Sequence, residues 1–570
     1  MKSNLFAEII NRFYLQNKIK FYCLFIFSLF AGLFEYMGLI LIFQFVLFLT
    51  NPNTKHCVGL IDFFETNLKI FDLSKISLIL GISIALIYIL KNIYMLIFTK
   101  FNNEILQDLS IKITTKIIKN LLFQDYLKVN SISSEEKLNI LSKVSFVVWQ
   151  YCYKYINLVI NCTIAIILLS YLFVKFTLAA SVATIFISAL ALVEYNYLAK
   201  NSTHQNKHFS VCFDELNSLI LKVISSIKEI KLNNKQEYFA TKIEEKCEDY
   251  SILNKNRTFC DVFHIYFTEI SVMLAMILVL GVLFCTTNFD NQILITTICT
   301  ICVVVLRLTP VVNRAQSCLY AINSNKGLVA ELLKFDDKFD KNFNFSTTQE
   351  KLSFNKAIEL RNVDFSYQED IGLKNIDLKI NKGSFVGIVG KSGCYKTTLS
   401  LILSGLIKAQ SGEFLIDGKK INNLDYQKWQ NNIALLSQDY SILFDEIEDD
   451  KYIEKLNLKI DAKANKLSYG EKQRYALANI LSQEKEILIL DEVTSSSDVI
   501  LENEINNILL SLKRQKTIIA IAHRFNILKY CDEIIYMYDG KIIDIGSFET
   551  LSKKYDEFKK MVELSSFKCN

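Results

Sequence analysis

A short segment of this chain has the composition of a phosphate-binding loop. The predicted strand Ser384–Val389 is followed directly by the run GKSGCYKTT at 390–398. In such loops, backbone N–H groups and the N-terminus of the next helix bind phosphate oxygens. A lysine neutralises the β and γ phosphates, and a hydroxyl ligates Mg²⁺. The expected nucleotide-contacting residues are Gly390, Ser392, Gly393, Cys394, Tyr395, Lys396, Thr397 and Thr398, with Thr397 as the Mg²⁺ ligand.

One position of this loop departs from the usual pattern GxxxxGK[ST]. Tyr395 stands where the pattern has glycine. Glycine at this position lets the backbone approach the ligand without a Cβ in the way. The loop taken alone is therefore a weak indication of nucleotide binding.

A later apolar strand ends in two carboxylates. Residues 487–490 are all Ile or Leu and precede Asp491 and Glu492. Asp491 would hold Mg²⁺, directly or through water, and Glu492 would polarise an attacking water. A structural strand ending in a charged turn has the same local pattern. The joint order of loop, strand and His523 nevertheless favours nucleotide binding.

A third segment, LSYGEKQR at 467–474, resembles the signature motif LSGGQ of ABC transporters. Tyr469 replaces the first glycine and Glu471 replaces the glutamine. The resemblance implies that Ser468 and Gly470 close on the γ-phosphate of an ATP bound by the other subunit. An active ATPase and a nucleotide-binding regulator both stay open, since Tyr395 and Tyr469 alter two motifs whereas the catalytic groups are retained.

Other residues match further motifs of the same family. Tyr367 resembles the aromatic residue that stacks on adenine, and Gln438 the glutamine that links Mg²⁺ to the membrane loops. Asp498 lies in a segment that resembles the D-loop, and His523 resembles the switch histidine that contacts the γ-phosphate. The run 227–237 resembles a stretch of the second cytoplasmic loop of exporters. The resemblance implies ATP and Mg²⁺ as cofactors.

The distribution of apolar residues along the chain predicts membrane-spanning helices before the segment that carries these motifs. Of 570 residues, 51% are hydrophobic and 22% are charged, and the two kinds are segregated along the chain. Apolar runs of about 20 residues are long enough to cross a membrane, and the N-terminus has no cleavable signal pattern. Six such runs are expected to be membrane spans, at 21–49, 76–98, 145–173, 177–198, 261–287 and 293–312.

Charge sets the expected orientation of these spans. The segment 99–144 carries seven lysines, and 199–260 carries nine lysines and Arg257, far more than the loops between them. Positive loops stay in the cytoplasm, so both termini are expected there, in a multi-pass protein of the inner membrane. The net charge of +5 is small and gives no reason to expect a nucleic-acid partner. The 14 cysteines show no metal-binding spacing.

The expected fold class is a six-span α-helical membrane domain of the type IV ABC exporter kind, followed by an α/β P-loop NTPase domain. The membrane domain is expected at 1–332, a polar linker at 333–355 and the ATP-binding domain at 356–570. The stretch between Gln438 and Leu467 is shorter than in relatives, which implies a shortened helical subdomain.

The resemblance implies a homodimer, although a heterodimer with a second half-size chain stays open. Short helices near Leu122–Lys128 and Ser210–Asn217 are expected to relay ATP-driven closure to the membrane helices. Candidate substrate residues are Glu35, Arg307 and Arg314, because their surroundings resemble flippases of lipid-linked oligosaccharides. The expected partners are therefore membrane lipids and an amphipathic or lipid-linked substrate. A peptide or multidrug exporter is the alternative.

Overall fold

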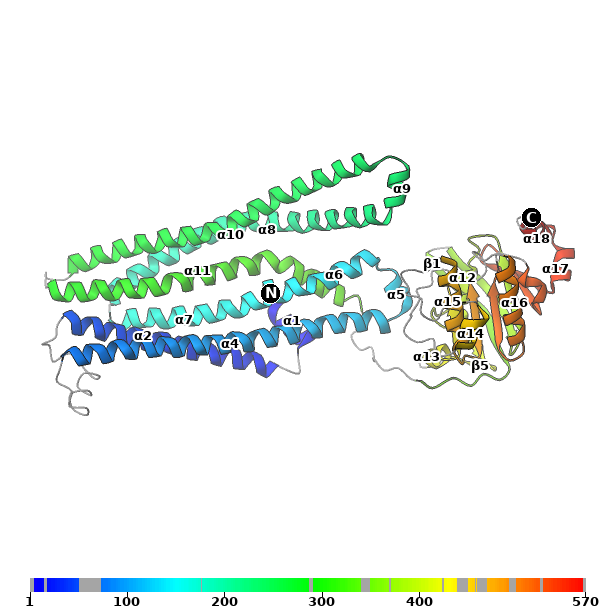
Figure 1. The fold of residues 1–570 in the computed structure, drawn as a ribbon, viewed down its shortest axis with the longest axis horizontal. Helices are drawn as coiled ribbons and strands as arrows, with labels where there is room; N and C mark the ends of the chain where they lie inside the picture. The colour runs from blue at the N-terminus through cyan, green and yellow to red at the C-terminus, as the bar shows by residue number, and fades with distance from the viewer. Residues whose placement is uncertain are drawn as a thin grey trace. The chain divides into compact units, whose positions relative to one another are not determined.

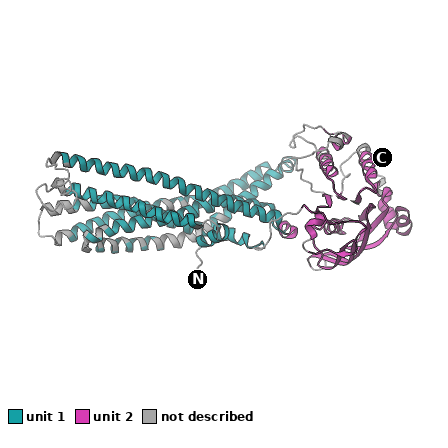
Figure 2. Ribbon diagram, turned by 90° about the horizontal axis from the view of Figure 1, so that it is seen from below, with its two compact units in different colours: residues 1–124, 131–343 teal, residues 125–130, 344–570 magenta. Residues whose placement is uncertain are grey.

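The computed structural model describes most of the chain in two compact units. The described residues are 5–14, 18–50, 73–175, 177–286, 291–339, 349–368, 371–422, 425–437, 450–456, 458, 469–491, 499–522 and 526–566. Unit 1 comprises residues 1–124 and 131–343, and unit 2 comprises residues 125–130 and 344–570, as coloured in Figure 2.

Unit 1 is a bundle of long helices (Figure 1). Its helices α4 and α10 each contain 51 residues, or roughly 75 Å at about 1.5 Å per residue. They are thus much longer than the roughly 30 Å hydrocarbon core of a bilayer. The described helices are α1 (Leu5–Phe13), α2 (Lys18–Thr50), α4 (Leu73–Phe123), α6 (Ser134–Phe146), α7 (Tyr153–Lys175), α8 (Thr177–Ser225), α9 (Ile227–Leu232), α10 (Gln236–Thr286) and α11 (Asn291–Asp336).

These helices pack mainly in pairs: α8 along α10, α7 along α11, and α2 along α4. A π-helical turn at Val147–Cys152 joins α6 to α7. The ammonium of Lys143 lies 3.0 Å from Asp214 Oδ2 and 3.0 Å from Glu331 Oε1. Because these residues come from α6, α8 and α11, the buried lysine ties three helices together.

Four helical stretches are long and apolar enough to cross a membrane: Ile19–Val46, Ser77–Phe123, Ser134–Ser170 and Ile265–Val282. Large apolar side chains on them face outward; Leu96 is 72% exposed and Ile277 is 66% exposed. A lipid environment explains such exposure better than water does. Helices long and apolar enough to cross a membrane are therefore found at four of the six expected spans. The other two, at 177–198 and 293–312, fall in α8 and α11, where many side chains lie outside the described set, and stay predictions.

The short helices in the long loops differ from one expectation. Helix α5 (Tyr126–Asn130) overlaps the expected position near Leu122–Lys128. The second short helix is α9 at Ile227–Leu232, whereas residues 210–217 lie inside α8, so the expectation near Ser210–Asn217 was wrong. Helix α9 connects α8 and α10 at the tip of their hairpin (Figure 1).

Unit 2 contains two β-sheets with helices around them. One sheet is antiparallel, in the order β2-β1-β4-β5, and the other has six strands in the order β10-β9-β3-β8-β7-β6. In the second sheet every pairing is parallel except that of β9 with β10. Its strands β7 and β8 are buried along their whole length, as expected of a parallel sheet covered on both faces.

The strands of unit 2 are β1 (Ala357–Gln368), β2 (Ile371–Asn381), β3 (Phe385–Gly390), β4 (Ser411–Ile416), β5 (Lys419–Lys420), β6 (Ile433–Leu436), β7 (Ile487–Asp491), β8 (Thr517–Ile521), β9 (Glu533–Tyr538) and β10 (Lys541–Gly546). Its helices are α5, α12 (Lys396–Leu403), α13 (Asp425–Gln430), α14 (Asp450–Lys455), α15 (Tyr469–Ser482), α16 (Val499–Leu512), α17 (Phe548–Lys554) and α18 (Asp556–Ser566).

Candidate functional site

The phosphate-binding loop lies between β3 and α12, at the carboxyl end of the parallel strands. Ligands bind at this edge in open α/β sheets because the strands end there and helix N-termini point toward it. In the described structure, Lys396 is 7% exposed, and its ammonium donates to Gly390 O at 2.9 Å and to Lys391 O at 3.1 Å. These two hydrogen bonds keep the lysine ammonium at the loop, where it can bind a phosphate.

The other loop residues surround the start of α12. Gly390 requires glycine, because a Cβ there would lie 2.3 Å from Met537 O and 2.5 Å from Cys394 Sγ. Gly393 has a positive φ of 85°, whereas Ser392 is exposed to solvent. The Cys394 thiol is buried, and this burial raises its pKa, so it is a packing group rather than a nucleophile at neutral pH.

The structure gives a second reason why glycine is usual at position 395. Tyr395 caps α12 with φ 66° and ψ 29°, the left-handed conformation that bulky residues rarely adopt. Its ring packs against the buried core of unit 2, and its Cδ2 lies 3.5 Å from where a Cβ on Gly540 would be. The Tyr395 side chain is thus accommodated by neighbouring residues, and the cost of the substitution lies in the backbone.

Strand β7 brings Asp491 to the same loop. The hydroxyl of Thr397 donates to Asp491 Oδ2 at 2.9 Å, and Asp491 is 4% exposed. Strand β8 lies between β7 and β3 in the sheet, so the pairing of three strands sets this contact. A hydroxyl and a carboxylate are the hard oxygen donors that Mg²⁺ prefers. These two residues therefore fit the expected metal site.

Tyr367, the expected adenine-stacking residue, lies at the end of β1. The residue is 49% exposed, and its ring packs edge-on against Phe365, with 4.9 Å between the ring centroids. Its hydroxyl lies 3.4 Å from Thr398 Oγ1 on α12. The structure therefore places an accessible aromatic surface next to the helix that follows the loop.

Gly470 occupies the second position of α15. A Cβ at this position would meet no described atom within 4 Å, so the described residues do not require glycine there. Five other expected site residues, namely Gln438, Ser468, Glu492, Asp498 and His523, lie outside the described residues, and their roles stay predictions. The same holds for the shortened helical subdomain, since residues 450–456 and Leu458 are the described part of residues 438–468.

The membrane candidates divide into a cluster and a separate residue. Glu35 on α2 is 7% exposed and forms an ion pair with Lys91 on α4. Arg307 on α11 lies over the ring of Tyr88, with its Cζ 4.3 Å from the ring centroid. Arg314 is exposed instead, and its Nε donates to Pro310 O at 3.1 Å. The structure thus brings Glu35 and Arg307 around α4 but leaves Arg314 apart.

The expected candidate set did not include Tyr88 and Lys91 of α4. Lys91 Nζ lies 5.6 Å from the Tyr88 ring centroid, so two cations approach one ring. The Tyr88 hydroxyl is buried and has no hydrogen-bond partner within the described residues. Gly38 leaves room for it, because a Cβ there would lie 2.8 Å from the Tyr88 oxygen. The sequence did hold a signal for this pair. Tyr88 and Lys91 are three residues apart, and on a helix that spacing places two side chains on one face.

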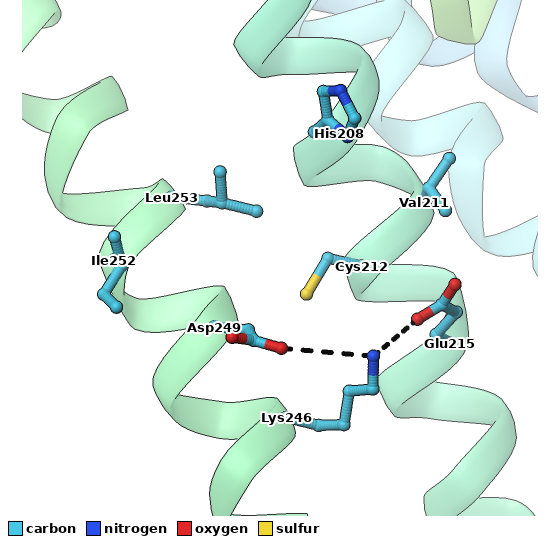
Figure 3. Close-up of a pocket in the computed structure, with 8 residues that line it drawn as sticks. All are labelled: His208, Val211, Cys212, Glu215, Lys246, Asp249, Ile252 and Leu253. Carbon is cyan, nitrogen blue, oxygen red and sulfur yellow. Dashed lines mark hydrogen bonds and ion pairs between the residues drawn. The ribbon is translucent and has the colours of Figure 1, made fainter.

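A surface cavity of about 340 Å³ lies between α8 and α10 (Figure 3). Lys246 holds the two carboxylates at this cavity, at 2.8 Å from Glu215 and 4.0 Å from Asp249. Burial raises the pKa of the neighbouring Cys212 thiol, so the thiol stays protonated and carries no charge at neutral pH. The two carboxylates and the lysine at this cavity are thus already paired with one another. Its lining residues are His208, Val211, Cys212, Glu215, Lys246, Asp249, Ile252 and Leu253.

Comparison with known families finds two matches along the chain. Residues 19–307 match the family described as ABC transporter transmembrane region, and residues 373–495 match the family described as ABC transporter. A solved bacterial Atm1-family ABC exporter with ATP bound has the same fold, with a TM-score of 0.74 over 96% of this chain and 98% of that chain, at 17% identity.

Curated relatives match shorter parts of the chain. It is 30% identical over 241 residues to a β-(1→2)glucan export ATP-binding/permease protein of Rhizobium johnstonii, covering 37% of this chain. It is 32% identical over 224 residues to an ATP-dependent lipid A-core flippase of Pectobacterium atrosepticum, covering 34% of this chain. It is 32% identical over 275 residues to an ABC multidrug transporter of Emericella nidulans, covering 42%. The matches span 40%, 38% and 20% of these relatives, respectively.

Proposed function

This chain belongs to the ABC transporter family, and we propose that it hydrolyses ATP to move an amphipathic substrate across the inner membrane, with both termini in the cytoplasm. The observation that carries the proposal is the joint placement of Lys396, Thr397 and Asp491 at one edge of the sheet. A cation and two oxygen donors at the N-terminus of a helix are the groups that bind a magnesium nucleotide.

The described and the undescribed site residues each have a role in this proposal. Lys396 binds the β and γ phosphates, Tyr367 stacks on adenine, and Thr397 and Asp491 hold Mg²⁺ together with Gln438. When bound, Mg²⁺ neutralises charge that develops on the phosphate oxygens. Glu492 orients the attacking water, and His523 contacts the γ-phosphate.

Gly470 supports a second copy of the chain as the partner. Nothing among the described residues requires glycine at this position, yet a close approach by another molecule would. We propose that Ser468 and Gly470 close on ATP held by the partner's loop, with Asp498 at the same interface. A heterodimer uses the same contacts, so the homodimer is tested by measuring activity of the chain alone.

The proposed division is a membrane domain at 1–332, a linker at 333–355 and an ATP-binding domain at 356–570. Helices α5 and α9 relay nucleotide-driven closure to the membrane helices. Residues 125–130 cluster with unit 2, where Leu127 packs against the core, which supports this role for α5. Helix α9 has the exposed apolar side chains Ile227 and Leu232, which suit a contact with another surface.

The charge cluster in the membrane supports an anionic head group on the substrate. Lys91 is neutralised by Glu35, whereas Arg307 has only the Tyr88 ring among its described partners. A guanidinium without a carboxylate inside a membrane bundle is costly, and a phosphate or carboxylate would compensate it. A lipid-linked oligosaccharide meets this description, and we propose it as the first candidate, ahead of a peptide or an amphipathic drug.

ATP hydrolysis by the purified chain in lipid nanodiscs tests the proposed activity. The expected result is hydrolysis that both Lys396→Ala and Glu492→Gln abolish. Lys391→Ala is the matched control, because this lysine is in the same loop but points to Glu557, 3.4 Å away on the surface. Hydrolysis in Lys391→Ala equal to wild type, with none in the other two, supports a working homodimer. Nucleotide binding without hydrolysis in wild type contradicts it and favours a partner chain or a regulator.

A second experiment addresses the substrate. Anionic lipid-linked saccharides are expected to stimulate hydrolysis in the wild type but not in Arg307→Gln. Arg314→Gln should keep the stimulation, because Arg314 lies apart from the cluster. Equal stimulation of all three proteins would remove Arg307 from the substrate site.

A further inference from the structure

A carboxyl group and an amide meet inside the helical bundle with too few donors between them. Glu194 on α8 is 4% exposed, and Gln316 Nε2 on α11 donates to its Oε2 at 3.0 Å. The two other oxygens of this pair, Glu194 Oε1 and Gln316 Oε1, are buried and have no hydrogen-bond partner within the described residues. Buried acceptors are nearly always paired in folded proteins, so this pair requires an explanation.

No described cation compensates a charge on Glu194. Helix α8 packs against α7, α10 and α11. Among the described side chains, the charges of Lys154 and Arg314 lie close enough to the Cys318 thiol to affect it electrostatically. Glu269 on α10 is exposed. The side chains of Lys200 and His204 on α8 and of Arg257 and His264 on α10 lie outside the described set. An ionised Glu194 would thus be buried with a neutral amide as its described partner, which is unfavourable.

One proton resolves the shortage of donors. A protonated carboxyl and a primary amide are complementary: the amide N–H donates to one carboxyl oxygen, and the acid O–H donates to the amide oxygen. We propose that Glu194 and Gln316 form a proton-binding site that holds one proton while α8 and α11 are packed together. The proton comes from water, and it returns to water when the carboxyl is hydrated and ionises.

This site links proton binding to the transport cycle, a step that rests on the proposed function. ATP-driven movement that separates α8 from α11 would expose Glu194 and release the proton. By linkage, a high proton concentration then favours the packed arrangement, and a low one favours the separated arrangement.

Infrared spectroscopy of the full chain in nanodiscs, without nucleotide, tests the protonation directly. Wild type at neutral pH is expected to show a carboxylic acid C=O band that Glu194→Gln lacks. Glu194→Gln keeps the amide contact and the side-chain volume. Glu215→Gln, which removes an exposed carboxylate on α8 that is paired with Lys246, is the matched control and should keep the band. No band in wild type, or an equal band in Glu194→Gln, overturns the proposal, because the carboxyl of Glu194 would then be ionised or the band would belong to another group.

Thermal stability as a function of pH gives a second readout. If the folded chain holds one proton more than the unfolded chain, the free energy of unfolding of wild type falls as the pH rises. Glu194→Gln lacks this proton, so its free energy of unfolding lacks this pH-dependent contribution. The difference in melting temperature between the two proteins should therefore change across the neutral range. A constant difference overturns the proposal. Neither readout needs ATP, so a chain that fails to hydrolyse ATP can still confirm the proton site.

Discussion

The hydroxyl of Thr397 and the carboxylate of Asp491 are joined by a hydrogen bond of 2.9 Å, although 94 positions separate them in the chain. The bond connects the first turn of α12 to the end of β7 across the intervening strand β8. Loop and strand are thereby held in register in the structure described here, and the two expected Mg²⁺ ligands are already adjacent.

Removal of the Thr397 hydroxyl should therefore impair metal use more than folding. Thr397→Val keeps the shape of the side chain but deletes one oxygen donor, and we expect Mg²⁺-dependent hydrolysis to fall about 10–100-fold. Thr397→Ser, which keeps the hydroxyl, is the control and should retain most activity. Equal activity of the two variants would exclude Thr397 as a metal ligand.

The left-handed backbone at Tyr395 predicts an unusual order of stability. Tyr395→Ala removes the ring and keeps the unfavourable conformation, whereas Tyr395→Gly removes both. A left-handed residue other than glycine costs roughly 1–2 kcal/mol, so Tyr395→Gly should unfold at a higher temperature than Tyr395→Ala. In the interior of a helix the order is reversed, because glycine is about 1 kcal/mol worse than alanine. Thermal melts of the two variants decide between these orders.

Because Lys143 is buried, removing its two carboxylate partners should destabilise the fold more than removing the lysine itself. Lys143→Met leaves Asp214 and Glu331 partly open to water, with side chains 33% and 43% exposed. The double variant Asp214→Asn, Glu331→Gln leaves the lysine, 7% exposed, without a carboxylate. An uncompensated buried charge is the more costly outcome. Melting temperatures should therefore be lower for the double variant than for Lys143→Met; the opposite order would show that Lys143 reaches water.

The ionised carboxylate of Asp417 should stabilise the fold at neutral pH but not in acid. Burial alone would raise the pKa of this carboxylate, but backbone N–H groups of Lys356, Asn355 and Ala357 donate to it and the pKa is lowered overall. A lowered folded pKa stabilises the fold above the unfolded pKa of about 3.9, and this contribution disappears as the pH falls through the folded value. The melting temperatures of wild type and Asp417→Asn should thus differ at neutral pH and converge in acid.

A matched carboxylate provides the comparison for this prediction. Asp539 also has a positive φ, 46°, but it is exposed in the turn between β9 and β10. Asp539→Asn should follow wild type at every pH. If Asp417→Asn keeps a constant offset from wild type into acid, its hydrogen bonds do not depend on ionisation.

The nucleotide loop was predictable because its residues are neighbours in sequence. The run 390–398 carries its own signal, and the apolar strand before Asp491 indicated where the carboxylate would lie. What could not be foreseen is how the chain accommodates Tyr395. Its ring packs near Gly540, a contact made through tertiary structure, and only coordinates reveal it.

The membrane part was less predictable for the same reason. Glu35 and Lys91 are 56 positions apart, and Glu194 and Gln316 are 122 apart, so no local pattern pairs them. The position of α9 did have a signal. Asn233 and Asn234 follow it, Asn234 has φ 54°, and asparagine tolerates that conformation in turns. Helix α8 meanwhile continues through 210–217 because no glycine or proline interrupts it.

The π-helical turn at Val147–Cys152 has a consequence for insertions and deletions in this chain. A wide turn holds one residue more than an α-helix needs at that point. Deleting one residue there would leave hydropathy and charge almost unchanged and make the helix regular. Because the wide turn absorbs one extra residue, this deletion would leave α7 in nearly the same rotational position relative to α6, whereas removal of a second residue would rotate α7 by about 100°. The junction between Lys143 and the membrane segment of α7 should therefore tolerate the loss of one residue better than the loss of two.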